Sequence, residues 1–149
     1  MRRLAPIAIV LCACGLPRDP KGTLEHVEHG TLRVGAFARD GWVRVDDDGE
    51  VGGCEAELVR SLADELGAEI EWTTDGESRL FEQLLEHRLD LVIGGITDDT
   101  RWHKEVGLSR PFAHEGEAAH VLAVPPGENA WLMAIDRFLV AHEPHAPCG

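Results

Sequence analysis

The chain has 149 residues, 44% of them hydrophobic, which is enough apolar material for one sizeable core and predicts a single globular domain. It carries 27 acidic residues against 14 lysines and arginines, a formal net charge of −13. Such a surface repels phosphate groups, so nucleic acid is not an expected partner, and any membrane contact must come from something other than attraction to anionic headgroups.

The first 13 residues have the pattern of a signal peptide. Arg2 and Arg3 precede an apolar stretch, residues 4–11, that is far shorter than the roughly 20 residues of a membrane-spanning helix. The stretch runs into "LCAC", residues 11–14, which resembles the bacterial lipobox. We expect cleavage before Cys14, acylation of Cys14 and a lipid-anchored position in the bacterial cell envelope, on the periplasmic or extracytoplasmic face. An ordinary secretory signal with incidental cysteines is the alternative.

Two further cysteines, Cys54 and Cys148, remain in the mature chain. In an oxidising envelope compartment they could form a disulfide that closes a long loop of chain. The alternative is two free thiols, because sequence spacing does not determine whether the two sulfur atoms meet.

Residues 14–30 are rich in proline, glycine and charge and are interpreted as a tether that leads into the domain. Alternating apolar residues then predict a strand over 31–37, and Asp48-Gly49 predicts the turn of a hairpin within 41–53. Residues 54–66 carry apolar side chains at helical spacing, with Gly67 as the stop signal.

The second half of the domain continues the alternation of strands and helices. A strand is predicted over 68–72, and Thr74 and Glu77 have capping-box spacing before a helix over 78–88. Residues 89–96, apart from Asp90, are apolar at consecutive positions, as in a central parallel strand. A strand over 119–124 and a helix over 127–142 complete the domain, 31–142, and a tail follows over 143–149. The order predicts an α/β fold with a single doubly wound, mostly parallel sheet.

Small and polar residues follow the predicted central strand. Ligands of such folds bind beyond the carboxyl ends of the strands. Gly94 and Gly95 would let the backbone approach a ligand closely, and Thr97 and Asp99 lie in the loop that follows. These residues are therefore candidate ligand-binding residues, although a glycine pair after a buried strand is often only a tight turn.

Four segments in this order resemble the bacterial extracellular solute-binding proteins of family 3, which are receptors of ABC importers for polar amino acids and related solutes. The segments are "LRVGAFARDGW", "DDDGEVGGCEAELVRSLADELGAEIEW", "LFEQLLEHRLDLVIGGITDDT" and "VGLSRPF". The resemblance implies a small-molecule solute and an ABC permease as partners. Family members have two lobes, but only residues 113–119 stand where the second lobe is inserted. We therefore expect a sheet that resembles lobe 1 of a type II periplasmic binding protein, with the second lobe absent.

The resemblance also implies further site residues. The position of the arginine that holds the carboxylate of an amino acid falls on Trp102, with Arg101 one residue earlier. Trp102 in that place would favour an apolar or cationic group, so the solute stays open. Trp42 lies near the family's stacking aromatic, or packs on the core instead. Because one lobe leaves the ligand face open, we expect millimolar affinity or none, unless a homodimer or another envelope protein supplies the second wall.

Two other function classes are compatible with the sequence. His142, His145 and Cys148 are spaced by three residues and could hold zinc or copper in an envelope metal-binding protein, unless a disulfide occupies Cys148. An interaction module that binds no small molecule is the other alternative. The sequence has no catalytic constellation and no cofactor motif, so neither an enzyme nor a cofactor is expected.

Overall fold

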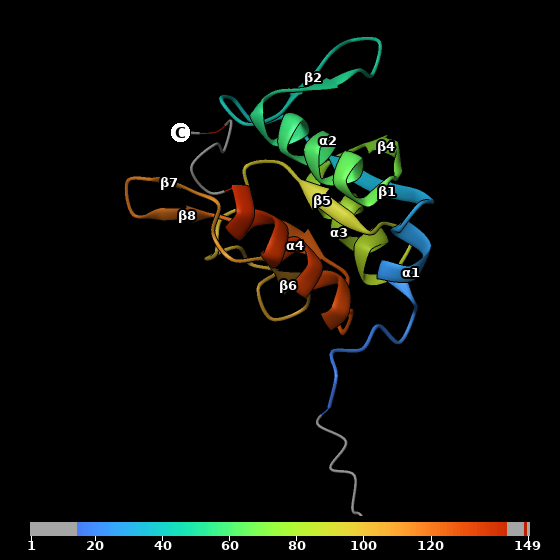
Figure 1. Ribbon diagram of the computed structural model, residues 1–149. Helices are drawn as coiled ribbons and strands as arrows, with labels where there is room; N and C mark the ends of the chain where they lie inside the picture. Colours follow the sequence, from blue (N-terminus) through green and yellow to red (C-terminus); the bar gives the residue numbers. More distant parts are fainter. Residues whose placement is uncertain (1–14, 143–147, 149) are drawn as a thin grey trace, which may run out of the picture.

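The computed structural model describes residues 15–142 and 148, and its centre is a five-stranded sheet (Figure 1). The strands are β1 (Thr31–Ala36), β4 (Glu69–Thr74), β5 (Leu91–Ile93), β6 (Gly107–Leu108) and β9 (Ala123–Val124). They lie in the order β4-β1-β5-β9-β6. β1 pairs in parallel with both β4 and β5, whereas β9 pairs antiparallel with β5 and β6. The predicted α/β fold with a mostly parallel sheet is confirmed.

Helices cover both faces of this sheet (Figure 1). They are α1 (Thr23–Val27), α2 (Cys54–Leu66), α3 (Glu77–Leu85) and α4 (Asn129–His142). The apolar sides of α1, α2 and α4 share one buried cluster that includes Leu91 and Ile93, while α3 packs with Val92 in a second cluster. Because neighbouring residues of β5 point to opposite faces, its unbroken apolar run reflects burial on both sides, as predicted.

Two short hairpins project from the sheet domain (Figure 1). One consists of β2 (Arg44–Val45) and β3 (Val51–Gly52), and its turn places Gly49 at φ 83°, which agrees with the predicted Asp48-Gly49 turn. The other consists of β7 (Ala113–Glu115) and β8 (Ala118–His120). This second hairpin occupies the short connector at 113–119, and the described part of the chain contains one lobe only.

The segment before β1 belongs to the folded domain, which corrects the predicted tether over 14–30. The Asp19 carboxylate accepts hydrogen bonds of 2.7 and 3.0 Å from two amides at the start of α4. The Thr23 hydroxyl donates to Glu128 over 2.6 Å, and Val27 is fully buried. Since these partners lie more than 100 residues away along the chain, the local composition of the segment did not reveal them. Any tether therefore ends before Asp19.

Two predicted boundaries also differ from the structure. Thr74 is the last residue of β4 and Gly76 is the N-cap of α3, with no side-chain cap, so the predicted capping box of Thr74 and Glu77 is wrong. The strand predicted over 119–124 is divided between β8 and β9, because the chain passes from the hairpin into the central sheet at Val121 and Leu122. By contrast, α2 has its predicted bounds, and Gly67 ends it in the left-handed conformation.

A disulfide joins Cys54, at the start of α2, to Cys148 across a sequence separation of 94 residues. The two Cα atoms are 5.2 Å apart, within the usual range for a disulfide, and only 6% of Cys148 is exposed. This bond holds Cys148 against the start of α2. The sulfur of Cys148 is consequently not a free thiolate.

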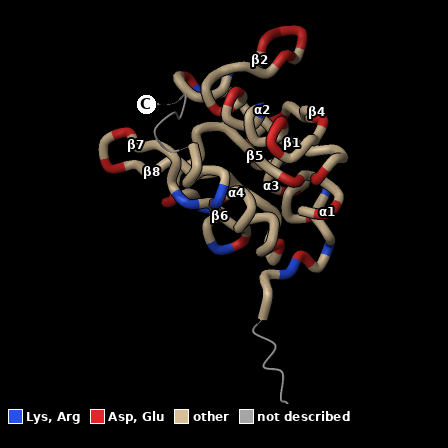
Figure 2. The backbone as a smooth tube through the Cα atoms, in the orientation of Figure 1, with Lys and Arg blue, Asp and Glu red and all other residues tan. Residues whose placement is uncertain are grey.

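The surface of the domain is strongly acidic. Figure 2 shows aspartate and glutamate residues at the tips of both hairpins. Within residues 15–142, no helix combines the length and the apolar composition that a membrane crossing requires.

Candidate functional site

Polar residues from two neighbouring strands meet at one edge of the sheet. β1 leads into Phe37 and Arg39, and β5 leads into Gly95 and Thr97. Because β1 and β5 are parallel neighbours, the residues that follow them lie side by side. Two adjoining hollows are found there. The α3-side hollow, about 340 Å³, is lined by Phe37, Arg39, Glu77, Gly95, Ile96, Thr97, Thr100 and Arg101. The hairpin-side hollow, about 280 Å³, is lined by Arg39, Asp40, Trp42, Gly95, Thr97, Glu115, Ala118 and His120.

The side chain of Arg39 borders both hollows. It lies over Gly95, where an added Cβ would come within 2.6 Å of the Arg39 Cγ atom, and Gly95 itself has φ 64°. Glycine at this position therefore permits both the turn and the close approach of the arginine. The Arg39 Nε–H donates a long hydrogen bond of 3.4 Å to the Gly94 carbonyl oxygen. Among residues 15–142 and 148, no carboxylate forms an ion pair with Arg39, so its charge is available to an anionic group.

The α3-side hollow holds a second guanidinium. The Arg101 Nη2–H donates a hydrogen bond of 2.7 Å to the Ser78 hydroxyl, and its Nε atom lies 4.0 Å from Glu77 on the first turn of α3. The Arg101 side chain is 63% exposed and keeps donors free for a ligand. Opposite it, the Thr97 hydroxyl donates to Asp99 over 2.5 Å, which turns Asp99 toward its own loop.

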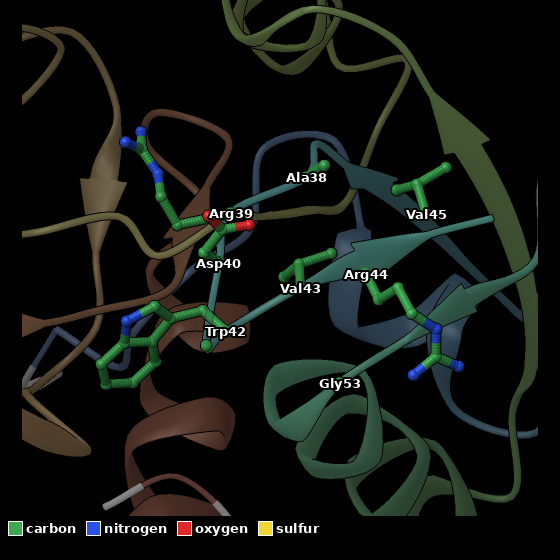
Figure 3. Close-up of a pocket in the computed structure, with 9 residues that line it drawn as sticks. Ala38, Arg39, Asp40, Trp42, Val43, Arg44, Val45 and Gly53 are labelled. Atoms are coloured by element: carbon green, nitrogen blue, oxygen red, sulfur yellow. The ribbon is translucent and has the colours of Figure 1, made fainter.

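The hairpin-side hollow is built around a stacked aromatic pair. The ring of Trp42 lies parallel to that of His120, with centroids 3.5 Å apart and an interplanar angle of 16°, and meets Phe112 edge-on at 6.2 Å. An adjoining cavity of about 490 Å³ is lined by residues 38–45 and Gly53. In Figure 3, Arg39 and Trp42 extend to one side of this segment and Arg44 to the other. One face of Trp42 is thus occupied by His120 and is not free to stack on a ligand.

His120 is buried, lacks hydrogen-bond partners for its ring among the described residues, and has a shifted pKa. It is 3% exposed, and neither ring nitrogen has a hydrogen-bond partner in the described part of the protein. Burial lowers the pKa of His120 below its ordinary value, against the opposing effect of Glu115. Burial therefore favours the neutral form of the ring.

Glu55 holds the backbone of the Gly94-Gly95 turn that borders the site. Its Oε2 atom accepts hydrogen bonds from the amides of Gly94 and Gly95, at 2.8 and 3.0 Å. Its Oε1 atom is buried without a partner in the described residues. Burial raises the pKa of Glu55 to about 7, although both amide hydrogen bonds and the charge of Arg39 act in the opposite direction. The Gly94 and Gly95 amides consequently bind protein and not ligand.

The structure gathers four of the seven predicted ligand-binding residues around the two hollows: Trp42, Gly95, Thr97 and Arg101. Gly94, Asp99 and Trp102 do not line them. Trp102 stacks on Phe81 with ring centroids 4.9 Å apart, and its Nε1–H donates to Glu77 over 3.3 Å. Trp102 therefore packs α3 against the loop, so its place differs from the prediction.

Sequence reasoning missed Arg39, Glu55, Glu115 and His120. Arg39 could have been found, because it follows β1 just as Thr97 follows β5 and the same rule applies to both strand ends. His120 carries no local signal, since its role depends on Trp42, which is 78 positions earlier in the chain and meets it only in the fold.

The structure offers little support for a metal site. In the described residues, the group of possible ligands that lie close enough together is Asp46, Asp48 and Glu50, at the solvent-exposed tip of the β2–β3 hairpin. The tail site proposed from sequence loses Cys148 to the disulfide, and His145 lies outside the described residues. His142 contacts the Phe138 carbonyl oxygen through Nδ1, at 2.8 Å.

Comparison with known proteins gives one family match and two matches to curated proteins. The model of the bacterial extracellular solute-binding proteins, family 3, matches residues 35–143. The membrane-bound lytic murein transglycosylase F of Actinobacillus succinogenes is 32% identical over 79 residues, which cover 52% of this chain and 16% of that protein. The protein of the same name from Haemophilus influenzae is 38% identical over 68 residues, 45% of this chain and 14% of its own length. The chain thus spans only a small part of these relatives.

Solved structures show the same one-lobe architecture. The arginine-bound form of domain 1 from TmArgBP has a TM-score of 0.71 and 26% identity, and the match covers 78% of this chain and 97% of that one. A point mutant of that domain, also arginine-bound, has a TM-score of 0.74 and 25% identity over 82% of this chain and 98% of the other. An ancestral amino acid-binding protein, at 15% identity and TM-score 0.73 over 84% and 95% of the two chains, shares the fold.

Proposed function

Because this chain belongs to the bacterial extracellular solute-binding proteins of family 3, we propose that it is an envelope receptor that binds an amino acid at the carboxyl ends of β1 and β5. The observation that carries this proposal is the meeting of Arg39, Arg101 and Thr97 at one edge of the sheet. Two guanidinium groups and a hydroxyl provide several donors for a carboxylate. Asp40 and Glu115 stand on the opposite side of Arg39 and suit a positively charged group.

Arginine is the first solute to test. It carries one carboxylate and two positively charged groups, which match a site that holds both cationic and acidic side chains around Arg39. Two solved one-domain structures similar to this chain hold arginine, which supports the idea that one lobe can bind a solute without a second. The acidic surface of the protein would also attract a cationic solute.

We expect weak binding by the isolated protein. A deep pocket covers about 70–90% of a small ligand, whereas one lobe covers a single side of it. Charge pairs that stay in contact with water contribute little. The proposal therefore includes a second wall from an ABC permease, another envelope protein or a second copy of this chain.

Localisation is the second part of the proposal. Acylation at Cys14, after removal of residues 1–13, would tether the domain to the envelope membrane. These residues lie outside the described part of the chain, so the proposal rests on the lipobox-like "LCAC" and on the extracellular setting of the family. The same family setting supports a binding role and not an enzymatic one. Metabolic labelling with a fatty acid should mark the wild-type protein and not a Cys14→Ala variant.

A pair of matched variants tests the proposed solute site. Arg39→Met removes the guanidinium shared by the two hollows, whereas Arg44→Met removes one that points away from them and pairs with Asp46 (Figure 3). In a ligand-observed NMR titration with L-arginine, we expect Arg39→Met to weaken binding by about 10-fold or more. Arg44→Met should bind like the wild type. Equal affinities in all three proteins would contradict the proposed site.

A further inference from the structure

His120 is the last residue of β8 and forms part of the hairpin-side hollow. Its side chain is buried, yet neither Nδ1 nor Nε2 has a hydrogen-bond partner among the described residues. Buried polar atoms in proteins are nearly always hydrogen-bonded, and an exception needs an explanation. A ligand that brings its own polar group is one.

The imidazole ring is held in a fixed orientation. Trp42 covers one of its faces at 3.5 Å, and the His120 carbonyl oxygen accepts a hydrogen bond of 3.0 Å from the Phe112 amide. The His120 backbone also forms a β-bridge with Thr97, which lines both hollows. The ring is therefore positioned by the same loop that is proposed to contact the solute, and it cannot turn away to find another partner.

The charges around His120 identify the kind of group that fits beside it. Glu115 places its Oε2 atom 3.8 Å from His120 Nε2, so the fold already brings a carboxylate to this nitrogen. The Glu115 side chain is 74% exposed and is free to move aside. Arg39 and Asp40 line the same hollow, and His114 adds a weak repulsion from β7. Because no carboxylate of the described residues forms an ion pair with Arg39, an anionic group is the ligand that best fits beside it.

We propose that His120 and Arg39 together bind the carboxylate of the solute, which takes the place of the Glu115 carboxylate next to Nε2. This inference rests on the proposed function. It adds His120 as a binding residue and gives the orientation of the solute's charged groups in the site. The displaced Glu115, with Asp40, then faces the ammonium group of the same molecule. One lobe would in this way contact both charges of an amino-acid head group.

Removing the ring nitrogens while keeping the stack on Trp42 tests the inference. His120→Phe retains an aromatic ring, and His120→Gln retains a hydrogen-bonding group. The probes are L-arginine and agmatine, which differ by the carboxylate. We expect His120→Phe to weaken binding of L-arginine by about 10-fold or more and to leave the affinity for agmatine unchanged, with partial recovery in His120→Gln. His142→Gln, at the far end of α4, is the control and should match the wild type for both probes.

The pKa of the His120 ring in the wild type distinguishes ligand binding from a purely structural role, because a purely structural role would leave that pKa unchanged by the ligand. The His120 ring is titrated by NMR with and without saturating L-arginine, and a bound carboxylate should raise its pKa, whereas agmatine should not. If the wild type binds L-arginine but His120→Phe binds it equally well, the inference is overturned and the proposed function stands. If the wild type binds neither probe, the proposed function fails and the inference fails with it. Circular dichroism of each variant confirms that it is folded.

Discussion

The disulfide between Cys54 and Cys148 gives the most direct prediction about stability. It closes a loop of 94 residues, and the loop-entropy model assigns such a bond about 4–5 kcal/mol at 25 °C. For a domain of this size, that corresponds to a fall in Tm of roughly 10–20 °C when the bond is lost. The bond also borders the site, because Cys148 lines a small cavity with Trp42 and Glu115.

The double variant Cys54→Ser, Cys148→Ser removes the disulfide. Urea unfolding followed by tryptophan fluorescence, in oxidising buffer and with a reductant, measures the free energy of unfolding. The wild type should lose about 4–5 kcal/mol on reduction, and the double variant should resemble the reduced wild type in both buffers. A loss below about 1 kcal/mol would refute the loop-entropy reasoning, and a double variant that still responds to reductant would refute the assignment of the disulfide.

Three further predictions concern the folded domain. Folding raises the pKa of Glu55 from 4.5 to about 7, so the wild-type fold should lose about 3 kcal/mol of stability as pH rises through that window. Glu55→Gln keeps an acceptor for the two glycine amides but removes the titrating carboxyl group. Urea titrations at pH 5 and pH 8 should therefore show a smaller loss in the variant, and an unchanged loss would contradict the cause given. Gly95→Ala should cost about 1–3 kcal/mol in the same assay and weaken L-arginine binding, because its Cβ would displace Arg39; a neutral result would mean that the loop readjusts freely. Asp19→Ala removes the cap of α4 and should lower the free energy of unfolding by about 1–2 kcal/mol. An unchanged free energy of unfolding would indicate that the segment before β1 is a tether and contributes nothing to the fold.

Much of the fold could be predicted because its signals are local. The helical stripe of α2 and its stop at Gly67 need only 14 neighbouring residues, and the apolar run of β5 reports burial on both faces. The N-terminal segment could not be predicted in this way. Its prolines, glycines and charges are typical of a tether, while the contacts of Asp19 and Thr23 with α4 and Glu128 appear only in the folded chain.

The same distinction applies to the candidate site. Gly95 and Thr97 follow a recognisable strand, so the rule about strand ends finds them. Trp102 has the sequence position of a ligand contact but packs on Phe81, because tertiary contacts decide which side of the loop it occupies. The stack of Trp42 on His120 joins two segments that no sequence pattern connects.

We propose that a single α/β lobe binds an amino acid where β1 and β5 end. The most direct test is a ¹H–¹⁵N NMR titration of the purified protein with L-arginine. Saturable shifts should concentrate on amides of residues 37–42, 95–101 and 115–120. Shifts that are absent at high millimolar ligand, or that concentrate at the β2–β3 tip around Asp46 and Glu50, would contradict this proposal.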